Sequence, residues 1–149
     1  MLKFKRILLS LACALILVST TGCRLIFEPE TDAIKELFAG MPKGDDMQVR
    51  QMCDNETVCN QLHQLIGVIK SDWYGTPREY YTIDGIEIAD DTGYSYVHIS
   101  LRLPVSGDRK PIMFPITFEM ERVKLRWRIY SVDHLDEYLR RASKARGIL

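Results

Sequence analysis

The hydrophobic period of the chain changes near Gly75-Thr76-Pro77, and this change constrains the fold more than any other feature. After it, apolar and polar residues alternate, as they do in strands that bury one face. Before it, apolar residues recur at the spacing of a helix with one buried stripe, formed by Val58, Leu62, Leu65, Ile66 and Ile69. The chain is therefore predicted to place helices first and an antiparallel sheet second.

Four strands are predicted after the change of period. The first runs over residues 81–88, with a bulge at Gly85. The second and third alternate along 97–103 and 112–118, after turns at 90–93 and 106–108. Pro115 cannot donate a backbone hydrogen bond, which indicates an edge position or a bulge. In the last strand, one face is predicted to carry Val123, Leu125, Trp127 and Ile129, and the other Lys124, Arg126 and Arg128.

Helices are predicted both before and after the four strands in the sequence. Acidic residues open a short helix near Glu30 that ends at Gly40, and a longer helical region covers 45–70. Asp133 is predicted to cap a C-terminal helix with two i,i+4 ion pairs, Asp136–Arg140 and Glu137–Arg141. The predicted fold class is α+β, with N-terminal helices packed on a four-stranded antiparallel meander and a C-terminal helix.

The run from Leu62 to Val132 resembles the small bacterial lipoproteins of the nuclear transport factor two-like superfamily. The resemblance rests on the order of helix, turn and strands and on the final strand, Trp127-Arg128-Ile129-Tyr130-Ser131-Val132. It implies a cone-shaped α+β domain. The helix that begins at Asp133 departs from the pattern. Because that superfamily includes enzymes, carriers and scaffolds, the resemblance implies no catalytic residue here.

The first 22 residues have the layout of a bacterial secretory signal. Lys3, Lys5 and Arg6 precede the apolar run Ile7–Val18, and small residues follow it. This run of twelve residues falls short of the ~20 that a membrane-spanning helix needs, so a permanent transmembrane anchor is the weaker alternative.

Thr20-Thr21-Gly22-Cys23 resembles the lipobox of bacterial lipoproteins, although an aliphatic residue is usual where Thr20 stands. The resemblance implies cleavage before Cys23, which would then carry lipid; a plain signal with an incidental thiol is the alternative. Arg24 follows in place of the Asp that holds such proteins at the inner membrane. We therefore expect a protein anchored in the outer membrane and facing the periplasm.

The predicted organisation is a signal peptide at 1–22, a lipid-anchored tether at 23–30 and a single domain at 31–149. Without the signal, 17 basic residues face 20 acidic ones, so nucleic acid is not an expected partner. Residues 122–149 nevertheless carry eight basic and three acidic side chains. This segment could be an ordinary solvated face, or it could meet anionic lipid or an acidic partner.

Cys53 and Cys59 are the cysteines that remain for pairing in an oxidising compartment. In one unbroken helix they would be ~9 Å apart along the axis, too far for a disulfide. Asp54-Asn55 between them indicates a helix break with a new N-cap, which would bring the two sulfurs together. A metal or redox pair is the alternative, but the spacing is not C-x-x-C.

No catalytic or cofactor motif is apparent in the sequence, and neither an enzyme nor a metal or cofactor site is expected. We expect a non-catalytic binding or assembly factor of the bacterial envelope, with a protein partner. The alternative is a carrier of a small apolar ligand between helices and sheet. The candidate partner-binding residues are Tyr96, His98, Thr117, Lys124, Arg126, Arg128, Arg140 and Arg141.

Overall fold

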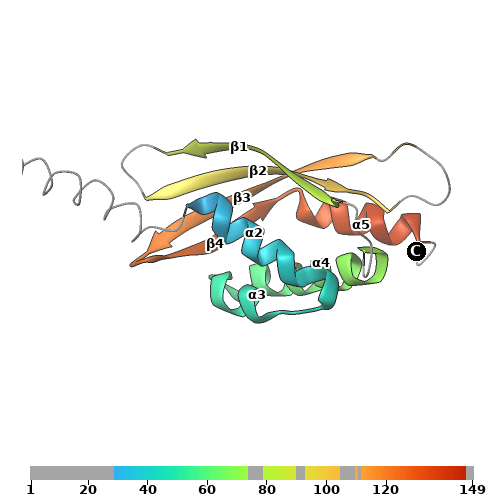
Figure 1. The fold of residues 1–149 in the computed structure, drawn as a ribbon, viewed down its shortest axis with the longest axis horizontal. Helices are drawn as coiled ribbons and strands as arrows, with labels where there is room; N and C mark the ends of the chain where they lie inside the picture. The colour runs from blue at the N-terminus through green and yellow to red at the C-terminus, as the bar shows by residue number, and fades with distance from the viewer. Residues whose placement is uncertain (1–28, 74–78, 90–92, 105–109, 111, 147–149) are drawn as a thin grey trace, which may run out of the picture.

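The computed structural model describes residues 29–73, 79–89, 93–104, 110 and 112–146 (Figure 1). Several predicted features lie outside these residues: the signal, Cys23 and most of the tether, the change of period at Gly75-Thr76-Pro77, most of the turn at 90–93 and the turn at 106–108.

Helices form the first part of the described chain. Helix α2 (Glu30–Gly40) has Glu30 and Asp32 in its first turn. Negative charges at this end of a helix interact favourably with the positive end of the helix dipole. A short turn, η1 (Met41–Lys43), then leads to α3 (Met47–Met52) and α4 (Glu56–Trp73). The predicted helical region is therefore two helices, with the break at Asp54-Asn55 that the sequence indicated.

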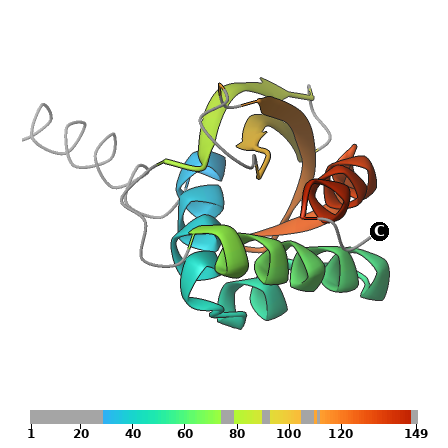
Figure 2. The same cartoon turned by 90° about the vertical axis from the view of Figure 1, so that its right-hand side faces the viewer.

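The second part is a four-stranded antiparallel sheet, followed by helix α5 (Leu135–Ala145). Strands β1 (Tyr81–Ile88), β2 (Tyr94–Arg102), β3 (Met113–Val123) and β4 (Arg126–Asp133) are neighbours in chain order. Figures 1 and 2 show a curved sheet with α2, α4 and α5 on its inner side. The predicted α+β class, with its meander and terminal helices, is confirmed.

The core lies between the helices and the inner face of the sheet. Every second residue of β2 is buried, because successive side chains of a strand point to opposite faces. The ring of Phe38 on α2 lies 6.0 Å from that of Phe118 on β3, edge to face, and stacks 4.6 Å from Tyr81. The sheet residues buried in this core are Val97, Ile99, Leu101, Phe114, Ile116, Phe118, Met120, Trp127, Ile129 and Val132.

The strand registers explain two features of the sequence. A bulge interrupts the β1–β2 register between Ile83 and Gly85, where the sequence predicted one. Pro115 lies in β3, but the pairing of β3 with β4 begins only at Thr117, so β4 does not reach Pro115. The Leu103 N–H donates to the Ile112 carbonyl, so these two residues form a hydrogen-bonded pair that continues the β2–β3 ladder. Hydrogen-bonded and non-bonded pairs alternate along an antiparallel ladder, so the nitrogen of Pro115, three residues further on, points away from β2. Pro115 therefore occupies a local edge and removes no hydrogen bond from the sheet.

Two predictions about the last strand are wrong. Lys124 and Leu125 form the turn between β3 and β4, and Lys124 has a φ of 60°, so neither residue continues a strand face. Val123 and Leu125 are exposed instead of facing the core. Asp133 is the final residue of β4, and His134 occupies the N-cap of α5 without a side-chain capping bond.

A disulfide joins Cys53 and Cys59, whose Cα atoms are 5.2 Å apart, as the sequence predicted. Helix α3 ends before Cys53, which is extended, and the Val58 N–H donates to Asn55 Oδ1 at 3.0 Å. The segment between α3 and α4 is also hydrogen-bonded to the edge strand β4. The Asp54 N–H donates to the Ile129 carbonyl and Asn55 Nδ2 to the Tyr130 carbonyl, both at 3.0 Å.

Long-range polar contacts hold α5 against α4 and the end of β2. Arg146 donates to the Asp72 carboxylate, at 3.1 Å from Nε to Oδ1, and both side chains are largely buried. The Tyr138 hydroxyl donates to the Arg102 carbonyl at 3.0 Å, and burial raises the pKa of that phenol. Of the two predicted i,i+4 pairs, Glu137–Arg141 forms, whereas Asp136 accepts a hydrogen bond from Gln61.

Candidate functional site

The face of the sheet that points away from the helices carries a set of polar and aromatic side chains. None of the described helices covers this surface (Figure 2). We call it the outer face and define it by the following residues on β2, β3 and β4: Tyr94, Tyr96, His98, Thr117, Glu119, Tyr130 and Ser131.

Hydrogen bonds between strands order the centre of the outer face. Tyr96 pairs with Glu119, and its hydroxyl lies 3.5 Å from one carboxylate oxygen. The Ser131 hydroxyl donates to the other oxygen of Glu119 at 2.7 Å. His98 Nδ1 lies 3.0 Å from the Thr117 hydroxyl. These contacts hold the side chains in place before any partner arrives, which reduces the entropy lost on binding.

Two tyrosines extend this face toward the start of β2. Tyr94 and Tyr130 form an edge-to-face pair with centroids 6.3 Å apart. Tyr130 is the extra residue of a bulge, because Glu119 pairs with Ser131 while Met120 pairs with Ile129. The negative charge of Glu121 raises the pKa of Tyr94, which keeps its phenol protonated. Tyrosine offers a large contact area and a hydrogen-bonding hydroxyl, and it is enriched at protein interfaces.

The predicted partner-binding residues do not form one surface. Tyr96, His98 and Thr117 lie together on the outer face. Arg128 pairs with Glu121, which pairs with Tyr94, so it adjoins the outer face at the β4 edge, where Nη1 is 3.3 Å from Asp54 Oδ1. Lys124 and Arg126 belong to the end of the β3–β4 hairpin. The last two, Arg140 and Arg141, lie on α5 at the opposite end of the molecule (Figure 1), where Arg141 bonds to Glu137 and lies 5.1 Å over the Phe114 ring.

Sequence reasoning did not select Tyr94 and Tyr130. The alternation of β2 places Tyr94 on the same face as Tyr96, so the sequence held the signal for the first. It also held one for Tyr130, because this residue continues the alternation of Arg128 opposite buried Trp127 and Ile129. The sequence held no signal for Ser131, which the bulge brings to the outer face beside Glu119.

A cleft of about 220 Å³ opens on the helical side, between α2, α3 and β4. It is smaller than most small-molecule sites, which are also predominantly apolar. Its lining is largely polar and comprises Ala33, Glu36, Gln48, Gln51, Met52, Arg126 and Trp127. Arg126, at the end of the β3–β4 hairpin, thus contributes to this cleft.

The described residues contain neither a metal-binding cluster nor a membrane-spanning helix. No group of three or more His, Cys, Asp or Glu side chains could hold a metal ion in residues 29–73, 79–89, 93–104, 110 and 112–146. In the same part of the chain, no helix has both the length and the apolar character needed to span a bilayer.

Comparison with known proteins gave no relative of the chain. No protein-family model matches it, and neither a curated protein nor a solved structure shows significant similarity.

Proposed function

We propose that this protein is a lipoprotein of the bacterial envelope, anchored through Cys23 in the outer membrane and facing the periplasm. It acts there as a non-catalytic binding or assembly factor. The observation that carries the binding role is the outer face, an ordered polar surface with three tyrosines that no described helix covers.

Two further features support this location. The charged start, apolar run and small residues before Cys23 have the order of a lipoprotein signal. The Cys53–Cys59 disulfide fits an oxidising compartment such as the periplasm. The curved sheet with helices on its inner side is also consistent with a nuclear transport factor two-like domain, although that resemblance implies no particular activity.

The partner proposed for the outer face is a protein. Tyr96 and Tyr130 combine apolar rings with hydroxyl groups, and Glu119, His98 and Ser131 add hydrogen-bonding groups between them. This mixture of rigid aromatic side chains and satisfied polar groups is typical of protein-binding surfaces.

Site-specific crosslinking in whole cells tests the binding role. A photoreactive phenylalanine analogue in place of Tyr130, which is 47% exposed, should give an adduct with a protein of the envelope. The same analogue at exposed Lys70 on α4 is the control and should give little adduct. If Tyr130 acts as an interface anchor, Tyr130→Ala should weaken capture of that protein by about tenfold or more. Adducts from Lys70 but not from Tyr130 would contradict the assignment of the outer face.

A further inference from the structure

The end of the β3–β4 hairpin has a composition that the fold does not explain. Residues 122–128 read Arg-Val-Lys-Leu-Arg-Trp-Arg, with four cations and no acid. Val123 is 39% exposed and Leu125 60%, and Lys124 and Arg126 are also exposed. We call residues 123–126 the hairpin tip.

The hairpin tip extends beyond the neighbouring strand of the sheet. The β2–β3 register ends at the pair Tyr94–Glu121, whereas Val123 and Arg126 still pair with each other. Within the described residues, the tip is therefore a two-stranded ribbon without a third strand beside it. Its apolar side chains contribute little to the core, and an exposed Leu next to exposed cations requires another explanation.

Helix α2 places the tip close to the point where the chain leads back to Cys23. Ala33 on α2 lines the same cleft as Arg126 and Trp127. Pro29 precedes Ala33 by four residues, which is about 6 Å along a helix. Figure 1 shows the start of α2 and the hairpin at the same end of the molecule.

The length of the tether limits how far this end can lie from a membrane. Cys23 and Pro29 are six residues apart in the sequence, so a fully extended chain between them spans at most about 20 Å. If Cys23 carries lipid, the hairpin tip must therefore lie near the bilayer surface. This step rests on the proposed function.

We propose that the hairpin tip is a second membrane contact, in which Val123 and Leu125 enter the headgroup region of a bilayer and Lys124 and Arg126 bind anionic lipid phosphates. Cations near an anionic leaflet are attracted to it, and apolar side chains bind by burial at the interface. The nearby acidic part of α2 carries Glu30, Asp32 and Glu36; Asp32 pairs with Lys35 at 3.4 Å, and Glu36 lines the cleft beside Arg126. The four cations of residues 122–128 outnumber these three carboxylates. The contact would fix the orientation of the domain and leave its outer face accessible.

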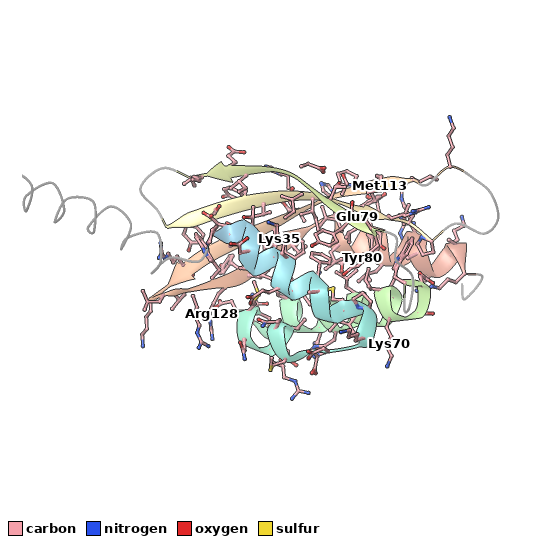
Figure 3. All side chains as sticks on the ribbon, in the orientation of Figure 1. Lys35, Lys70, Glu79, Tyr80, Met113 and Arg128 are labelled. Carbon is pink, nitrogen blue, oxygen red and sulfur yellow. A yellow bond between two sulfur atoms is a disulfide. The ribbon has the colours of Figure 1, made fainter. Side chains whose placement is uncertain are left out.

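The test uses the full chain, produced with its own signal and reconstituted in vesicles that contain phosphatidylglycerol. A fluorescent label on Leu125→Cys should be quenched by spin-labelled lipids. The matched control is Ile112→Cys, because Ile112 is 56% exposed and adjoins Met113 at the other end of the molecule (Figure 3). Its label should remain unquenched. Equal quenching at both positions, or none at Leu125, would overturn the proposal.

Charge variants identify the lipid chemistry. Lys124→Gln with Arg126→Gln should weaken the contact by roughly thirtyfold, at about fivefold per cation, and reduce quenching at Leu125 to the control level. Arg140→Gln with Arg141→Gln should leave the quenching at Leu125 unaltered. Unchanged quenching in the Lys124 and Arg126 variant, or equal quenching in neutral phosphatidylcholine vesicles, would refute binding to anionic lipid.

Vesicle flotation separates the tip contact from the anchor. A chain that floats with an unquenched label at Leu125 would refute the contact and leave the anchored function standing. A chain that stays in the soluble fraction would refute both. If the label is protected only after an envelope extract is added, the tip binds a protein and the lipid contact is wrong.

Discussion

Phe38→Ala should lower the free energy of unfolding by about 3–5 kcal/mol, the usual cost of removing a buried aromatic side chain. Phe38 is fully buried, and its ring contacts Tyr80, Tyr81 and Phe118. It therefore joins α2 to the inner face of the sheet. Its carbonyl also accepts a hydrogen bond from the Tyr80 hydroxyl, so collapse around the cavity would disturb a second buried contact.

Urea denaturation followed by circular dichroism measures this loss. Leu125→Ala is the matched control, because it also truncates a large apolar side chain but at an exposed position. Its effect should stay within about 0.5 kcal/mol. Equal losses in the two variants would contradict the packing of α2 on the sheet.

Removing the disulfide should have the second largest effect on stability. Cys53→Ala with Cys59→Ala should cost about 2 kcal/mol, because the bond closes a short loop and limits the unfolded chain. Locally, the bond supports the segment through which Asp54 and Asn55 bind the edge of β4. Amide exchange at Asp54 should therefore accelerate more than exchange in the centre of the sheet.

A reductant provides the control for this prediction. The native protein in excess dithiothreitol should unfold at the same urea concentration as the double variant, and dithiothreitol should not affect that variant. A double variant as stable as the oxidised protein would show that the bond contributes nothing.

The sequence was sufficient where a local pattern determines the structure. Alternation from Val97 to Leu103 predicted β2 and its buried face, and Asp54-Asn55 predicted the helix break that allows the disulfide. Gly85 predicted the bulge in β1, because the apolar pattern changes phase at that residue. In each case, the residues that decide the structure are neighbours in the sequence.

The sequence was insufficient where distant residues or unusual backbone geometry decide the structure. The alternation of Val123, Lys124 and Leu125 continues through a turn, since Lys124 adopts a positive φ that its residue type does not predict. Arg128 lies on the face of β4 opposite Trp127 and Ile129, as predicted, but its ion pair with Asp54 joins residues 74 apart in the sequence and could not be predicted. The candidate surface was therefore divided between the outer face, the hairpin tip and α5.

Acylation of Cys23 is the most direct test of the proposed function. Cells fed an alkyne fatty acid should label the native protein, and Cys23→Ser should lose the label and release the protein from the membrane fraction. Cys13→Ser, within the proposed signal, is the matched control and should keep both. An unlabelled native protein, or a Cys23→Ser variant that stays membrane-bound, would contradict the account.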